Sequence, residues 1–127
     1  MNIVEKFKEY VDSFNSKDKE ITQRYKHSID VMELMGELAY RLGLSDEEIK
    51  LARLIGLLHD IGRFVQWDKF KTFKDKDSID HADASCNYLF KEGHIRDYIE
   101  DSNYDSIIEK AISNHNKFEI NNNLSNK

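Results

Sequence analysis

The alternation of apolar and polar positions along the chain predicts a succession of amphipathic helices. Apolar residues recur at intervals of three and four, the period of a helix with one buried face. With their capping residues, the predicted helices cover residues 3–14, 18–43, 45–62, 78–91 and 103–114. No segment has the alternation typical of a strand, and proline is absent, so the sequence predicts an all-α fold.

Capping signals set most of the predicted boundaries. Asp18 is a suitable N-cap for the second helix, and Gly43 suits the left-handed position that often ends one. The stretch 45–48, Ser-Asp-Glu-Glu, has the pattern of a capping box that opens the third helix. Gly62 is expected to end that helix.

Residues 63–77 interrupt the pattern with alternating lysines and aromatic residues. We expect the lysines to lie on a solvated loop and the aromatic residues to cap the bundle. The lysines are Lys69, Lys71, Lys74 and Lys76, and the aromatic residues are Phe64, Trp67, Phe70 and Phe73.

Length and composition indicate a single domain over residues 1–127, with a polar tail at 119–127. Cys86 is the only cysteine, so no intrachain disulfide is possible and a cytoplasmic location is expected. No apolar run is long enough to span a membrane. A net charge of −5 argues against a stable nucleic-acid complex.

Histidines supply the candidate chemistry. Four of the five lie at helical positions beside apolar stripes: His27, His59, His81 and His115. Asp60 directly follows His59, and imidazole together with carboxylate suits a divalent Mn, Fe, Co, Ni or Zn ion. The alternative interpretation is that each histidine is half-buried and only forms a hydrogen bond with a neighbour.

The motifs around these histidines resemble those of the HD-domain superfamily of metal-dependent phosphohydrolases. Residues 24–28 (Arg-Tyr-Lys-His-Ser) resemble its first ligand motif, and residues 57–62 (Leu-Leu-His-Asp-Ile-Gly) resemble the motif that names it. Residues 80–85 and 112–116 resemble the later histidine motifs. The resemblance covers about residues 20–118 and implies a bundle of five or more helices around a metal site.

The resemblance also implies roles for individual residues. His27, His59 and Asp60 would bind one divalent metal ion (Mn, Fe, Co, Ni, Zn or Mg), and Asp60 would orient or deprotonate the attacking water. His81 and His115 would either complete a second metal site or bind the substrate phosphate. Arg24 and, more weakly, Arg63 would hold that phosphate through paired hydrogen bonds. The expected substrate is a phosphate ester of a nucleotide or a similar small molecule.

One part of the family pattern is missing. The family has a further metal-binding Asp on a helix after the last histidine motif, and no aspartate follows His115 here. The replacements we consider are Asp30, Asp80, Asp83 and Asp105. Without that helix, we expect apolar side chains near Tyr104, Ile108 and Ile112 to be exposed, which favours a weak homodimer.

Two other functions compete with the hydrolase. The first is a non-catalytic metal- or nucleotide-binding HD module that lacks the final Asp ligand. The second is a helical interaction domain whose histidines are only structural. Metal content separates the second from the others, and turnover separates the hydrolase from the binding module.

Overall fold

The computed structural model describes residues 2–15 and 17–114, which form α-helices joined by short turns. The helices are α1 (Ile3–Asp12), α2 (Lys19–Arg41), α3 (Asp46–Leu58), α4 (Gly62–Phe70) and α5 (His81–Cys86), with residues 105–114 also helical. Single π or 3₁₀ turns lie at Asp75–Asp77, Asn87–Lys91, His94–Asp97 and Ser102–Tyr104. The described residues contain no strand, and the all-α prediction is confirmed. None of their helices is long and apolar enough to cross a membrane.

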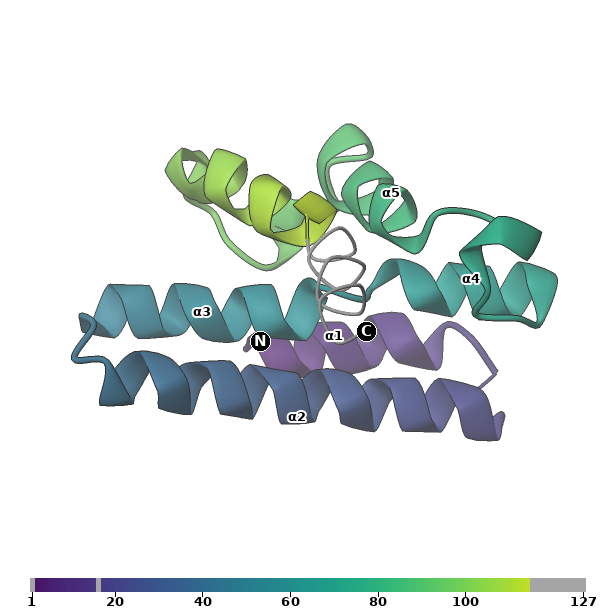
Figure 1. The fold of residues 1–127 in the computed structure, drawn as a ribbon, viewed down its shortest axis with the longest axis horizontal. Helices are drawn as coiled ribbons and strands as arrows, with labels where there is room; N and C mark the ends of the chain where they lie inside the picture. Colours follow the sequence, from purple (N-terminus) through teal and green to yellow (C-terminus); the bar gives the residue numbers. More distant parts are fainter. Residues whose placement is uncertain (1, 16, 115–127) are drawn as a thin grey trace, which may run out of the picture.

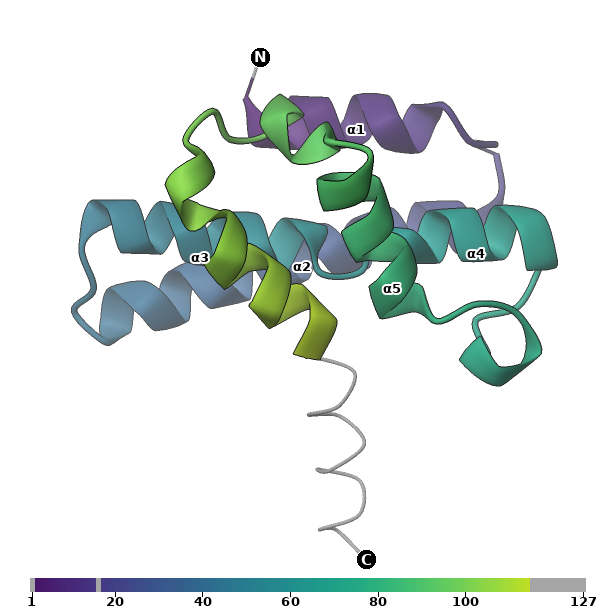
Figure 2. The ribbon, with the colours of Figure 1, turned by 90° about the horizontal axis from the view of Figure 1, so that it is seen from above.

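The long helices α2 and α3 form an antiparallel pair, and α1 and α4 pack against this pair (Figure 1). Their capping signals are used as predicted: the Asp18 side chain accepts from Glu20 N, and Ser45 and Glu48 form both bonds of a capping box. Gly43, with φ +76°, makes the left-handed turn between the two helices. Seen from above, α5 and the helix at 105–114 cross over α3 and α4 (Figure 2).

Gly62 has a different role from the one predicted. Helix α3 ends at Leu58, with His59 as its C-cap, three residues earlier than expected, and Gly62 is the first residue of α4. A Cβ atom on Gly62 would lie 2.4 Å from the His81 carbonyl oxygen and 2.7 Å from Ser85 N. The glycine therefore permits close packing of α4 against α5, and its own N–H donates to Ser85 Oγ at 2.8 Å.

The segment 63–77 is also more ordered than predicted. Residues 63–70 belong to α4, and Phe64 is completely buried. Residues 71–80 form a loop that contains the 3₁₀ turn at Asp75–Asp77. In this loop Phe73 stacks on Trp67, with ring centroids 5.0 Å apart. The four lysines are exposed, as expected. The prediction of a loop was wrong for the residues of α4. We expected the preceding helix to continue to Gly62, and therefore did not recognise that a new helix begins at this glycine.

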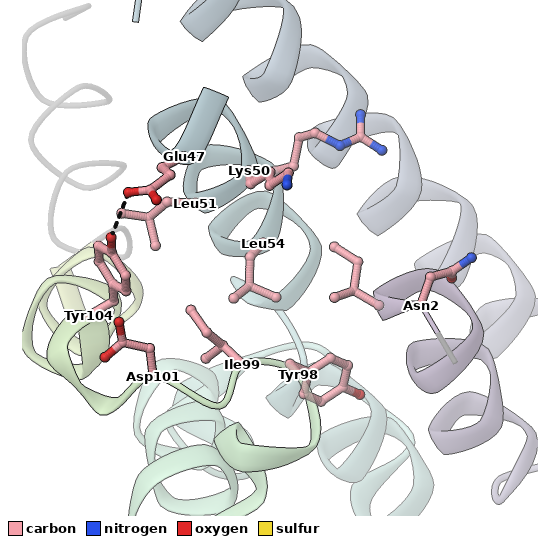
Figure 3. A pocket seen from close by; sticks show the side chains of 11 residues that line it. Asn2, Glu47, Lys50, Leu51, Leu54, Tyr98, Ile99, Asp101 and Tyr104 are labelled. Carbon is pink, nitrogen blue, oxygen red and sulfur yellow. Dashed lines mark hydrogen bonds between the residues drawn. The ribbon is translucent and has the colours of Figure 1, made fainter. Parts of the chain in front are cut away.

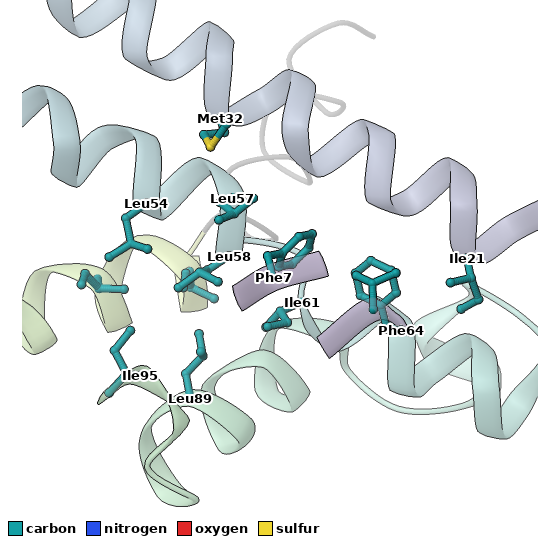
Figure 4. Close-up of a cluster of buried hydrophobic side chains, with 13 residues drawn as sticks. Phe7, Ile21, Met32, Leu54, Leu57, Leu58, Ile61, Phe64, Leu89 and Ile95 are labelled. Atoms are coloured by element: carbon teal, nitrogen blue, oxygen red, sulfur yellow. The ribbon is translucent and has the colours of Figure 1, made fainter. Parts of the chain in front are cut away.

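The hydrophobic core gathers side chains from α1, α2, α3 and α4 and from the segments that follow α5 (Figure 4). Phe7, Met32, Leu57 and Phe64 all contribute to it, and each is at most 1% exposed. The predicted helix at 78–91 divides into α5 and a π-helical turn, which places Leu89 in the same cluster.

The expected exposure of the last described helix was wrong. Ile108 and Ile112 are 0% exposed and belong to the main core, whereas Ile107 on the opposite side is 53% exposed. Since residues 105–114 pack directly onto the core, the argument that led us to expect a weak homodimer no longer applies.

Candidate metal centre

Asp60 lies at the centre of the candidate site. It follows directly after His59, the C-cap of α3, and is 7% exposed. Three histidines from three different segments approach its carboxylate. His59 Nε2 and His27 Nε2 lie 3.3 and 3.8 Å from Oδ2, and His81 Nε2 lies 3.6 Å from Oδ1. Helix packing thus brings together side chains that are up to 54 positions apart in the sequence.

His27, His59 and Asp60 form a group that fits a metal ion. One ligand atom from each lies within 4.8 Å of the others. His59 Nδ1 lies 2.7 Å from the carbonyl oxygen of Gly56, which can only accept, so the ring donates there and its lone pair is on Nε2. Two imidazole nitrogens and one carboxylate oxygen match the donor preferences of a divalent Mn, Fe, Co, Ni or Zn ion.

The electrostatic environment favours the neutral form of His27. Burial lowers the pKa of its imidazole, and the nearby His59 and Arg24 lower it further, against the opposing effect of Asp60. A histidine must be neutral to bind a metal ion, so this shift prepares His27 for that role.

Arg24 lies one helical turn before His27 on α2. Its Nη1 is 3.9 Å from Asp60 Oδ2, and its guanidinium carbon lies 4.3 Å from the centre of the Phe73 ring. The contact with Phe73 holds the guanidinium by a cation–π interaction while the side chain remains 30% exposed. Arg24 is therefore positioned to meet an anion that approaches Asp60 from solvent.

His81 faces the other oxygen of Asp60 from a buried position. The residue is 1% exposed, and its Nδ1 lies 2.7 Å from Asp75 Oδ2. Burial raises the pKa of the Asp75 carboxyl, but hydrogen bonds from His81 and from Gln66, the latter at 2.9 Å, outweigh it and hold this pKa below its ordinary value. Asp75 is consequently ionised at neutral pH.

Comparison with known proteins agrees with this arrangement. A family model described as "HD domain" matches residues 24–126. The chain belongs to the HD domain family. Ribonuclease Y from Protochlamydia amoebophila (strain UWE25) is 54% identical over 39 residues, which cover 31% of this chain and 7% of that protein. No solved structure matches the chain at a significant level.

The remaining predicted site residues of this HD domain differ in their placement. Arg63 points its Nη1 at acceptors within the protein: the Phe73 carbonyl at 2.7 Å, Gln66 Oε1 at 2.8 Å and Asp75 Oδ1 at 3.2 Å. The guanidinium thus holds the 71–80 loop on α4. His115 lies outside the described residues.

Two of the four carboxylates considered as replacements for the last family ligand have other structural roles. Asp80 is the N-cap of α5, and Asp105 forms an ion pair with Arg96. Among the described residues, the metal-ligand group contains Asp60 as its only carboxylate.

Sequence reasoning missed Asp75, Gln66 and Phe73 as parts of the site. Neither Asp75 nor Gln66 was considered as a site residue, and Phe73 was grouped with the capping aromatic residues. Only their contacts distinguish them, because Gln66 Nε2 reaches Asp75 Oδ1, Ser78 Oγ and the Ile79 carbonyl across the loop. A local motif gives no indication of such contacts.

A separate cavity of about 560 Å³ lies beside the first half of α3 (Figure 3). Leu51, Leu54 and Ile99 line it, and the Tyr104 hydroxyl at its edge donates to Glu47 Oε2 at 3.3 Å. The residues that line it include none of the candidate metal ligands. The candidate ligands His59 and Asp60 lie at the other end of α3.

Proposed function

We propose that this HD domain is a metal-dependent phosphohydrolase that acts on a phosphate ester of a nucleotide or a related small molecule. The observation that carries the proposal is the grouping of His27, His59 and Asp60 within 4.8 Å, with the Arg24 guanidinium 3.9 Å from the same carboxylate oxygen. A cation site next to a fixed guanidinium is the charge arrangement that a transferring phosphoryl group requires.

His27, His59 and Asp60 would hold the ion, with His81 and His115 as the further candidates. When bound, a divalent ion polarises a phosphoryl oxygen and makes water more acidic. The protein's part is to supply neutral imidazole nitrogens and to fix their direction, as the bond between His59 Nδ1 and the Gly56 carbonyl does.

Arg24 and Asp60 have complementary roles in this proposal. Arg24 would bind phosphate oxygens in two parallel hydrogen bonds, and its cation–π contact with Phe73 would hold the guanidinium near Asp60 before substrate arrives. Asp60 would orient the attacking water and accept its proton, since this carboxylate is 7% exposed and lies beside the ligand nitrogens.

A non-catalytic metal- or nucleotide-binding HD module is the second candidate. It is favoured by the observation that Asp60 is the only carboxylate in the metal-ligand group of the described residues. Such a module would bind Mn²⁺ and nucleotide without turnover.

Three measurements on the purified protein test the proposal. Elemental analysis should find a divalent metal, and phosphate release from a panel of nucleoside monophosphates should depend on added Mn²⁺. Arg24→Ala should raise KM by about 10- to 100-fold with a smaller change in kcat, because a charge-assisted hydrogen bond contributes about 1.5–3 kcal/mol. The matched control is Arg41→Ala, which removes an exposed arginine from the same helix.

The outcomes discriminate between the candidates. Binding of Mn²⁺ without phosphate release from any member of the panel supports the binding module. Hydrolysis that continues in the presence of a chelator contradicts the proposed mechanism.

A further inference from the structure

A chain of hydrogen bonds connects α4 to His81 through the 71–80 loop. Arg63 Nη1 and Gln66 Nε2 both donate to Asp75 Oδ1, at 3.2 and 2.9 Å. The other oxygen, Oδ2, lies 2.7 Å from His81 Nδ1 and 3.4 Å from the backbone nitrogen of the same residue. Both oxygens of Asp75 therefore face donors, and the carboxylate has one orientation that satisfies them all.

This orientation selects one tautomer of His81. Nδ1 lies within hydrogen-bond distance of a carboxylate oxygen, at 2.7 Å from Asp75 Oδ2, whereas the distance from Nε2 to Asp60 Oδ1 is too long for a hydrogen bond. The single proton of the neutral ring is therefore on Nδ1, where it is donated to Asp75, and the lone pair is on Nε2. Nε2 is the atom that lies 3.6 Å from Asp60 Oδ1. The hydrogen bond to Asp75 opposes a flip of the ring, because a flipped ring would present a carbon atom to Asp75 Oδ2 in place of Nδ1.

We propose that Asp75 is a positioning residue that fixes His81 in the Nδ1–H tautomer and directs the Nε2 lone pair toward the candidate metal centre. Arg63 and Gln66 orient Asp75 for this task. His81 then acts as an electron-pair donor to a cation and not as a proton donor to substrate. The use of the lone pair rests on the proposed function, whereas the tautomer does not.

Asp75→Asn is the sharpest test because it keeps the shape of the side chain while it changes the donors and acceptors; it also removes one negative charge, as the control substitution below does. The amide oxygen is drawn toward Arg63 and Gln66, which both donate, and the amide nitrogen then faces His81 Nδ1. That nitrogen donates to Nδ1, so the ring proton moves to Nε2. The substitution should therefore reverse the tautomer of His81.

The tautomer is read by ¹⁵N NMR of the imidazole rings in metal-free protein, at a pH well above the range in which imidazole titrates. The His81 signals are assigned by their loss in His81→Gln. We expect a protonated Nδ1 in the wild type, a protonated Nε2 in Asp75→Asn, and the wild-type pattern in Asp77→Asn. Asp77 is the matched control because it is an exposed carboxylate in the same 3₁₀ turn.

Either of two NMR results overturns the proposal. A wild-type His81 with its proton on Nε2 does so without any variant, so the test survives even if Asp75→Asn fails to fold. An unchanged tautomer in Asp75→Asn, together with a lower melting temperature, shows a merely structural role for Asp75.

Calorimetric titration with Mn²⁺ tests the second half of the proposal. Asp75→Asn should weaken Mn²⁺ binding about 10- to 100-fold, whereas Asp77→Asn should leave it unchanged. A reversed tautomer with unchanged Mn²⁺ affinity contradicts the role of the lone pair. If the wild type neither binds Mn²⁺ nor hydrolyses any ester, the proposed function fails while the tautomer result still decides the role of Asp75.

Discussion

The two oxygens of Asp60 face surroundings of opposite character. On the Oδ2 side, the side chains of His27 and Arg24 are 48% and 30% exposed. On the Oδ1 side, the side chain of His81 is 2% exposed and is held by Asp75. The first side is open to a ligand from solvent, and the second is a fixed wall whose hydrogen bonds are made within the protein.

This contrast shows how a small helical domain combines access with rigidity. The open side is built from α2 and from His59, the C-cap of α3, and the exposed side chains of α2 can meet an anion. The fixed wall needs three segments, α4, the 71–80 loop and α5, and its polar groups depend on buried hydrogen bonds such as those of Gln66, which is 0% exposed. Variants that affect one side or the other test whether ligand access on the open side and rigidity of the fixed wall can be changed separately.

Asp60→Asn should have the largest effect because it affects both sides at once. We expect kcat/KM for Mn²⁺-dependent hydrolysis to fall about 1,000-fold or more, together with a loss of Mn²⁺ affinity. Phosphate release and calorimetric titration measure the two effects. Asp68→Asn, at an exposed position on α4, is the control, and activity retained in Asp60→Asn would contradict the central place of this carboxylate.

Gly62→Ala should disturb only the fixed wall on the Oδ1 side of Asp60. The new Cβ would lie 2.4 Å from the His81 carbonyl, so α4 and α5 must move apart and the protein should lose about 1–3 kcal/mol of unfolding free energy. Urea unfolding measures this loss. Gly36→Ala is the control, because there the close neighbour is the flexible Arg53 side chain at 2.7 Å. Equal losses in both variants would show that the α4–α5 contact is not special.

Phe73→Leu should have a weaker effect, and its largest part should fall on the open side, because the Phe73 ring lies closer to Arg24 than to Arg63. It removes the ring under the Arg24 guanidinium, a cation–π contact of about 0.5–1 kcal/mol at an exposed site, so KM should rise a few-fold with kcat nearly unchanged. Steady-state kinetics measures the change, with Phe70→Leu on the exposed end of α4 as the control. A selective fall in kcat would instead place Phe73 in the chemical step.

The smallest expected effect is the pH dependence that His27 contributes to stability. Its pKa is lowered in the folded state from an ordinary value of 6.5, so the unfolded state binds more protons just below that pH. Metal-free protein should therefore lose stability as the pH falls below about 6.5, and His27→Gln should remove part of this loss. Melting temperatures between about pH 7.5 and 5.5 measure it. The lowered pKa of Asp75 acts only below 3.8 and does not interfere.

Local signals explain what the sequence predicted correctly. Asp18, Gly43 and the capping box at Ser45 act within one helical turn, so their roles can be seen without tertiary structure. The approach of His27 to Asp60 was expected from the family resemblance. Helical spacing alone would not have predicted this approach, because the spacing of residues within one helix does not show which other helix packs against it.

The wrong predictions share a tertiary cause. Glycine is typical of the position that ends a helix, but Gly62 lies where α5 packs so closely that a Cβ atom would not fit. Ile108 was expected to be exposed because of a missing later helix, although its own helix packs on the core. The role of Asp75 depends on donors nine and twelve residues earlier, a relationship that neither periodicity nor motif spacing encodes.

Trp67 gives the domain a built-in optical reporter. It is the only tryptophan, it stacks on Phe73 beneath Arg24, and its indole N–H donates to Asp18 Oδ2 at 3.0 Å, at the start of the helix that carries His27. Fluorescence excited selectively through the indole therefore comes from one known place beside the open side of Asp60. Emission intensity and wavelength can follow the arrival of a phosphate ester without any label, and a ligand that is never hydrolysed is detected as readily as a substrate.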